Sequence, residues 1–145
     1  MNIRSVFFLA VFILGAAPAA ALAQDTGDPE KGKQLIRKCT TCHQIGGSGK
    51  LAVGPNLTNV VGRKAGTAEG YDASKLSQAA GEAGLVWTEE LIVQYLPDPK
   101  GFIVKVLTEA GKADQAKGAY KMPISFKNEE DNRHLAAYLK SLSAN

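Results

Sequence analysis

The stretch Cys39-Thr40-Thr41-Cys42-His43 contains both cysteines of this 145-residue chain and one of its two histidines. The spacing C-x-x-C-H, with a histidine directly after the second cysteine, is typical of covalent haem attachment. Two thiols about one helical turn apart can add to neighbouring vinyl groups of a porphyrin, and the adjacent imidazole can bind the iron. The motif therefore predicts one haem c bound through Cys39 and Cys42, with His43 as an axial ligand.

Three other uses of a C-x-x-C pair are open to this chain. A zinc site normally takes four protein ligands, so the two cysteines would have to recruit His43 and His134. A thioredoxin-like redox pair expects a preceding strand in a βαβ unit, and no strand pattern precedes Cys39. A disulfide across two residues would be strained and would close a very short loop. The histidine that directly follows Cys42 favours haem over all three.

The composition is that of a single small globular domain, with 45% apolar residues, 21% charged residues and a formal net charge of +3. The net positive charge is small, and the chain contains no basic run with interleaved aromatic residues. We therefore expect no binding to nucleic acid.

The first 23 residues are predicted to be a cleaved secretory signal peptide. Arg4 supplies a positive charge, residues 6–17 are mainly apolar, and residues 21–23 read Ala-Leu-Ala, an A-x-A cleavage signal. A retained membrane anchor is the alternative, but a bilayer span takes about 20 apolar residues. Residues 24–145 would then form the mature domain, exported to the periplasm.

The remaining chain shows helical and no strand periodicity. Apolar residues recur at helical spacing, for example at Leu135, Tyr138, Leu139 and Leu142. The sequence predicts an all-α domain with four to five helices of roughly 10–15 residues. Capping residues at five helix starts are expected to be Asp28, Asp72, Thr88, Asp98 and Asn128. Residues 108–121, which are polar and rich in Gly and Ala, are expected to form a surface loop.

Gly54-Pro55-Asn56-Leu57, which follows C-x-x-C-H and a glycine-rich loop, resembles the small soluble class I cytochromes c of bacteria and mitochondria. The resemblance implies the cytochrome c fold, in which helices wrap around one covalently attached haem. It also implies that the Pro55 carbonyl accepts the proton on the far nitrogen of His43. A metal-bound imidazole needs such an acceptor to fix its tautomer and orientation.

Four further residues resemble family positions around the haem. Arg63, within Val60-Val61-Gly62-Arg63-Lys64-Ala65-Gly66-Thr67, would lie near the propionates, although by itself it reads as a solvated surface residue. Tyr71 would face a propionate, and Trp87, whose simpler role is core filling, would donate its N–H to one. The spacing of Tyr95 from Trp87 would put it in the pocket near the sixth ligand.

The resemblance also predicts how the two ends of the chain meet. The first helix would cross the last one at Gly32, packed against Leu135 and Tyr138. The segment between Pro99 and Met122 is longer than in mitochondrial members and resembles longer bacterial ones.

Met122 is the predicted sixth ligand, because it is the only methionine once the leader is removed. Thioether ligation opposite histidine raises the reduction potential of haem iron. The loop Lys121-Met122-Pro123, with Phe126 shortly after it, resembles the ligand loop of the family. The alternatives are a packed Met122 beside an open iron, or His134, which we expect to be exposed, as the ligand.

A haem with both axial positions filled by protein predicts outer-sphere electron transfer and no enzymatic activity. The alternative is a haem peroxidase or gas sensor with an open sixth position. In the family, lysines around the haem edge dock on acidic surfaces of reductases, oxidases or reaction centres, so we expect redox partners of this kind and transient contact with membrane complexes. The candidate lysines are Lys38, Lys100, Lys121 and Lys127. The protein is expected to be a monomer.

Overall fold

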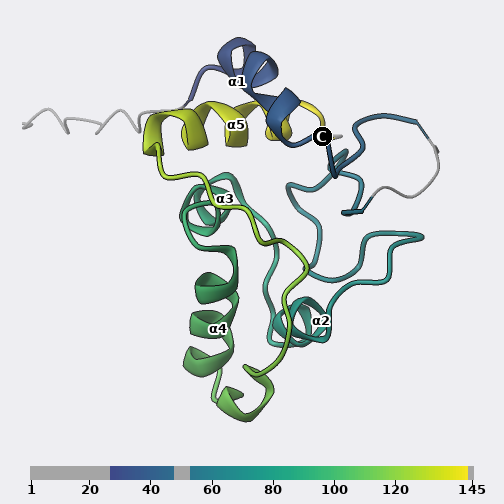
Figure 1. The fold of residues 1–145 in the computed structure, drawn as a ribbon, viewed down its shortest axis with the longest axis vertical. Helices are drawn as coiled ribbons and strands as arrows, with labels where there is room; N and C mark the ends of the chain where they lie inside the picture. Colours follow the sequence, from purple (N-terminus) through teal and green to yellow (C-terminus); the bar gives the residue numbers. More distant parts are fainter. Residues whose placement is uncertain (1–26, 48–52, 144–145) are drawn as a thin grey trace, which may run out of the picture.

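The computed structural model describes residues 27–47 and 53–143, and these residues form an all-α fold (Figure 1). The elements, in chain order, are α1 (Pro29–Leu35), the 3-10 turn η1 (Ile36–Lys38), α2 (Lys75–Glu82), α3 (Glu89–Tyr95), α4 (Pro99–Glu109), the 3-10 turn η2 (Ala113–Gln115) and α5 (Glu129–Ser141). Within the described ranges, β pairing is limited to an isolated bridge between Lys64 and Val86. The predicted all-α class is confirmed.

Four of the five predicted caps are confirmed. The side chains of Asp28, Thr88, Asp98 and Asn128 accept hydrogen bonds from backbone N–H groups in the first turns of α1, α3, α4 and α5. The helices α1, α2 and α3 contain only seven or eight residues, fewer than predicted. The chain tightens into η1 after Leu35, and Pro97 follows α3 closely, so neither helix continues.

The predicted cap at Asp72 is wrong. Ser74 caps α2 by accepting a hydrogen bond from the N–H of Ser77, and the helix begins at Lys75. Asp and Ser are both good capping residues, so the sequence pattern alone did not separate the two positions. The expected end of this helix is observed, because Gly84 adopts φ +97°, a left-handed conformation suited to a helix terminus.

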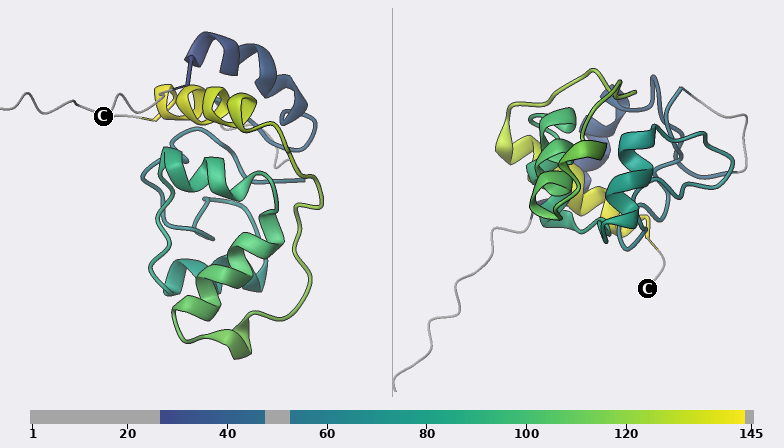
Figure 2. Two further views of the ribbon diagram at one scale, coloured as in Figure 1. Left: turned by 90° about the vertical axis from the view of Figure 1, so that its left-hand side faces the viewer. Right: turned by 90° about the horizontal axis from the view of Figure 1, so that it is seen from below.

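The two ends of the described chain cross where α1 lies against α5 (Figure 2). Gly32 is buried at the crossing, and a Cβ built on it would lie 2.7 Å from the Cβ of Tyr138 and would also collide with the backbone carbonyl of His134. The predicted contact of Gly32 with Tyr138 is therefore confirmed. On the α5 side, the close neighbours at this point are Tyr138 and the His134 backbone, whereas Leu135 lies in the core.

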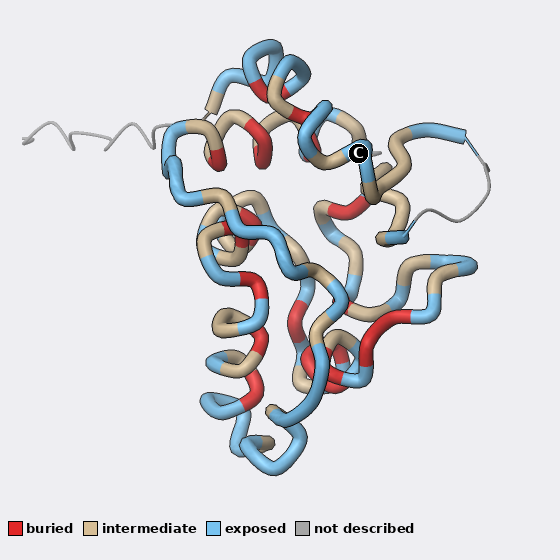
Figure 3. Tube along the Cα trace, viewed as in Figure 1, coloured by how far each residue is buried: buried red, intermediate tan, exposed pale blue. Residues whose placement is uncertain are grey.

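Two apolar clusters make up the core. One joins η1, α3 and α5 and contains Ile36, Val60, Ile92, Leu96, Leu135, Ala136 and Leu139. The other joins α2 and α4 and contains Ala65, Leu76, Ala79, Ala80, Leu85, Ile103 and Leu107. Figure 3 shows these buried positions on the sides of the helices that face the rest of the molecule. Trp87 and Tyr95 pack against both clusters, so they mark where the two halves meet.

The segment 108–121 is mostly irregular, as predicted, with two differences. The helix α4 continues to Glu109, and η2 forms a short turn at residues 113–115. The predicted signal peptide, residues 1–23, lies outside the described residues. In the part of the chain that is described, no helix has the length and apolar character needed to cross a membrane.

Candidate haem-binding site

A cavity of about 320 Å³ lies beside the first of the two clusters. It is lined by residues of that cluster and by the connecting loops. Trp87, Tyr95 and Tyr120, which pack against the second cluster, complete the lining. All nine residues predicted for the site contribute to its lining: Cys39, Cys42, His43, Pro55, Arg63, Tyr71, Trp87, Tyr95 and Met122. Cys39 and Met122, which are 83 positions apart in the sequence, thus line the same cavity.

The two cysteines lie on one tight turn that continues η1. The N–H groups of Cys42 and His43 both donate to the carbonyl of Cys39, at 3.1 and 2.9 Å. This turn gives the one-turn separation predicted for the two thiols. Both thiols are free and half-buried. Burial raises the pKa of the Cys39 thiol, and the charge of Lys38 partly opposes this rise.

The imidazole of His43 is held in one tautomer. Its Nδ1 lies 2.8 Å from the carbonyl oxygen of Pro55. A carbonyl oxygen can only accept, so Nδ1 carries the proton and Nε2 keeps its lone pair. Burial lowers the pKa of His43, and the bond to Pro55 partly opposes this shift, so the ring is neutral near pH 7. A neutral imidazole with a free Nε2 is the form that binds a metal.

Gly54 makes room for this ring. A Cβ at residue 54 would lie 2.7 Å from Nδ1 of His43 and 3.0 Å from Nε2. Any larger residue would displace the ring from its position against Pro55. The glycine of the Gly54-Pro55-Asn56-Leu57 motif is therefore required by the close approach of the His43 ring.

The thioether of Met122 lines the same cavity, where Tyr95 donates a hydrogen bond to its sulfur at 3.2 Å. The hydroxyl of Tyr120 lies 2.8 Å from that of Tyr95. Burial raises the pKa of both tyrosines, and the neighbouring hydroxyls of Tyr95 and Ser77 partly oppose the rise at Tyr120. Both phenols therefore stay protonated at neutral pH.

His134 was expected to be exposed, and this is wrong. Its side chain is only 12% exposed, and its Nδ1 accepts a hydrogen bond from the N–H of Asp28 at 2.8 Å. It thus joins α5 to the start of α1. Among the described residues, no group of three or more His, Cys, Asp or Glu side chains is placed to hold a metal ion, so the structure does not assemble the four-ligand zinc site considered above.

Arg63 is half-buried, unlike the solvated residue that its sequence context alone indicates. Its guanidinium donates to the carbonyls of Asn56 at 2.9 Å and Thr58 at 3.3 Å. Desolvation lowers its pKa. These bonds tie the loop after His43 to the cavity wall, and the proposed contact with propionates stays a prediction.

Trp87 belongs to an aromatic group on the cavity wall. Its ring stacks on Phe102 at 6.1 Å between centroids and meets Tyr95 edge-on at 4.9 Å. Phe102 also contacts Tyr95 edge-on at 5.8 Å. The core-filling role expected for a lone tryptophan is therefore observed, and its predicted bond to a propionate remains untested.

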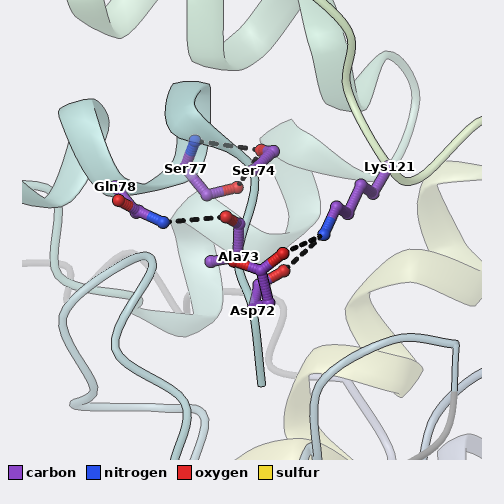
Figure 4. Close-up of polar contacts among 6 residues, drawn as sticks. All are labelled: Asp72, Ala73, Ser74, Ser77, Gln78 and Lys121. Carbon is purple, nitrogen blue, oxygen red and sulfur yellow. Dashed lines mark hydrogen bonds and ion pairs between the residues drawn. The ribbon is translucent and has the colours of Figure 1, made fainter.

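Sequence reasoning missed the contacts that hold the Met122 loop. Lys121 donates to the backbone carbonyl of Asp72 and pairs with its carboxylate at 3.1 Å (Figure 4). Its ammonium group also lies over the ring of Tyr71. The buried side chain of Asn132 donates to the carbonyl of Phe126 at 2.9 Å. No local pattern could have indicated the Lys121–Asp72 contact, because it joins segments 49 residues apart.

Comparison with known proteins identifies the family of this chain. Residues 29–143 match the family model for Cytochrome c. The chain belongs to the cytochrome c family. It is 49% identical over 119 residues to cytochrome c2 iso-2 of Rhodospirillum centenum, which covers 82% of this chain and 98% of that protein. It is 50% identical over 115 residues to a cytochrome c2 of Rhodopseudomonas palustris, which covers 79% of this chain and 98% of that one.

Solved structures agree with this assignment. The structure of cytochrome c2 from Rhodospirillum centenum matches with a TM-score of 0.79 at 49% identity, over 81% of this chain and 100% of that one. The ferricytochrome c2 of Rhodopseudomonas palustris matches with a TM-score of 0.75, over 80% and 99%. This member of the cytochrome c family is therefore an electron carrier and not an enzyme.

Family membership and the Cys39-x-x-Cys42-His43 motif together imply covalently bound haem c. The described residues fit that group. Two free thiols, a neutral imidazole and a thioether line one cavity whose other walls are mainly apolar. Soft thioether sulfur and imidazole nitrogen are both ligands of haem iron in proteins.

Proposed function

We propose that this protein is a periplasmic one-electron carrier in which His43 and Met122 are the two axial ligands of a low-spin haem. The observation that supports the proposal is the pairing of a preset imidazole and a hydrogen-bonded thioether at one cavity. When bound, haem c supplies a reversible Fe(III)/Fe(II) couple.

The residues of the cavity favour a carrier over a peroxidase or gas sensor. Activation of peroxide requires polar groups at an open iron position. Arg63, a half-buried cation at the cavity, is engaged with two backbone carbonyls. His134 is engaged with the start of α1. Neither is free to act beside an open iron, whereas Met122 presents a thioether to the same cavity as His43.

The attachments of the Met122 loop also suit electron transfer. On the N-terminal side of Met122, Lys121 donates to the carbonyl of residue 72. On the C-terminal side, the N–H of Phe126 donates to the carbonyl of Leu96, and the carbonyl of Phe126 accepts from the side chain of Asn132. A loop fixed on both sides changes little between oxidation states. A small structural change lowers the reorganisation that accompanies each electron transfer.

Absorption spectroscopy of the exported, haem-loaded protein tests the proposed ligation. We expect sharp reduced bands and a weak near-infrared ferric band from sulfur ligation. Met122→Ala should keep the haem, lose the near-infrared band, lower the potential and admit cyanide or carbon monoxide. His134→Gln is the matched control, because its side chain binds Asp28 outside the cavity lining, and its spectrum should stay unchanged. A high-spin wild-type ferric spectrum would contradict the proposal.

We also propose export through cleavage of residues 1–23 and docking of the monomer on redox partners with acidic surfaces. Lys38 and Lys121 line the cavity, which supports a cationic rim. Each has a carboxylate neighbour, Asp131 at 3.9 Å and Asp72 at 3.1 Å, which reduces the net charge of that rim. We therefore expect a modest dependence of electron-transfer rate on ionic strength, measured by stopped-flow against an acidic redox protein. A rate that rises with salt would contradict docking on acidic surfaces.

A further inference from the structure

Tyr120 is a third phenol at the cavity, beside Tyr71 and Tyr95, and the site described above gives it no task. Its hydroxyl lies 2.8 Å from that of Tyr95, and the rings meet edge-on with centroids 6.4 Å apart. The Tyr95 hydroxyl in turn lies 3.2 Å from the sulfur of Met122. Three side chains thus form a line that ends at the thioether.

The chemistry of the sulfur gives this line a direction. A thioether has no proton and can only accept a hydrogen bond, and a phenol has one proton to donate. If Tyr95 gave its proton to Tyr120, the sulfur would receive none. Both contacts can be hydrogen bonds at once only if Tyr120 donates to Tyr95 and Tyr95 donates to Met122.

Two serines at the start of α2, Ser74 and Ser77, also line the cavity. Their hydroxyls lie 3.0 Å apart, and Ser77 partly opposes the rise that burial causes in the pKa of Tyr120. Figure 4 shows these two serines side by side at the helix start, where the Ser77 N–H donates to the Ser74 oxygen.

Two hydroxyl protons therefore serve two contacts: Tyr120 to Tyr95, and Tyr95 to sulfur. Both contacts are hydrogen bonds only when each proton points toward Met122. The opposite direction would leave the sulfur without a donor and would turn one hydroxyl away from its neighbour. Since buried polar groups favour full pairing, the satisfied arrangement is the stable one.

We propose that Tyr120 is a positioning residue that donates to Tyr95, directs the Tyr95 proton at the sulfur of Met122, and thereby raises the reduction potential of the haem. The inference rests on the proposed His43 and Met122 ligation. The positive end of an O–H dipole beside the sulfur withdraws electron density from it. The ferric state, which depends more on that density, is destabilised relative to the ferrous state. The low polarity of the cavity strengthens the effect.

Reduction potentials of three haem-loaded variants test the inference: Tyr120→Phe, Tyr95→Phe and the double variant. Phe keeps each ring and its packing, so the fold is retained. We expect Tyr120→Phe to lower the potential by less than Tyr95→Phe does. The double variant should equal Tyr95→Phe, because Tyr120 acts only through Tyr95.

Tyr138→Phe is the matched control. Tyr138 packs at the crossing of α1 and α5 and is not part of the cavity lining, so its variant should keep the wild-type potential. An unchanged or higher potential in Tyr120→Phe would overturn the inference, since a rise would mean that Tyr120 accepts the proton of Tyr95. Drops that add in the double variant would overturn it as well.

The near-infrared ferric band separates this inference from the proposal on which it rests. If the band is present in wild type and Tyr120→Phe leaves the potential unchanged, only the role of Tyr120 fails. If the wild-type band is absent, the ligation by Met122 fails, and the role of Tyr120 fails with it.

Discussion

Gly32→Ala is the substitution whose effect the structure defines best. The new Cβ would lie 2.7 Å from the Cβ of Tyr138, whereas carbon atoms in ordinary contact are about 3.5–4.0 Å apart. The methyl group would also collide with the backbone carbonyl of His134, which cannot rotate away as a side chain can. The helices α1 and α5 would therefore have to separate by about 1 Å.

The expected cost follows from two opposing effects. Overpacking of a tight contact typically costs about 1–3 kcal/mol, and a collision with backbone puts this case at the upper end. Alanine favours a helix by about 1 kcal/mol over glycine, which offsets part of that cost. We expect a net loss of about 2 kcal/mol in the free energy of unfolding, and a fall in Tm of about 5–10 °C.

Guanidinium unfolding of the haem-loaded protein, followed by far-UV circular dichroism, measures this loss. Lys33→Ala is the control, because Lys33 is the next residue of α1 and is exposed. Its effect should lie within about 0.5 kcal/mol of zero. If Gly32→Ala unfolded with the same midpoint as Lys33→Ala, the two helices would have room to spare, and the close crossing would be refuted.

Three further predictions concern the cavity and its loops. Gly54→Ala should push the His43 ring from Pro55 and destabilise the protein by about 1–3 kcal/mol; unfolding as in wild type would show that the ring has other space. Burial raises the pKa of Tyr95, so the stability that its protonated form contributes is complete below about pH 10 and is lost as the pH rises further. The free energy of unfolding in urea should therefore fall less steeply between pH 9 and 11 in Tyr95→Phe than in wild type, by up to about 1.4 kcal/mol per pH unit. Equal slopes in the two proteins would contradict this prediction. Asp72→Asn removes an exposed ion pair and should cost less than about 1 kcal/mol, a difference in Tm that disappears at high salt.

Local signals in the sequence identified much of the fold and the site. Caps such as Asp28 and Thr88 act on backbone N–H groups within a few residues, so their pattern is readable without tertiary information. The turn that carries Cys39 and Cys42 is also local. The Met122 prediction needed a different argument, elimination, because one methionine remained after the leader.

Other features depend on contacts that sequence patterns do not encode. His134 has polar neighbours in α5, which indicated exposure, but α1 lies on that part of the helix and Asp28 binds its ring. Tyr120 and Tyr95 are 25 residues apart, and only the packing of α3 against the Met122 loop joins their hydroxyls. The local pattern around Asp72 indicates a helix start, but its carboxylate pairs with Lys121, which lies 49 residues further along the chain.

The apolar lining of the cavity bears on stability as well as on redox chemistry. The walls of the cavity are mainly apolar, and each Å² of apolar surface removed from water stabilises a fold by about 25 cal/mol. Haem c attached through Cys39 and Cys42 would cover these walls. The prosthetic group would then contribute to the hydrophobic core of the protein as well as carry the electron.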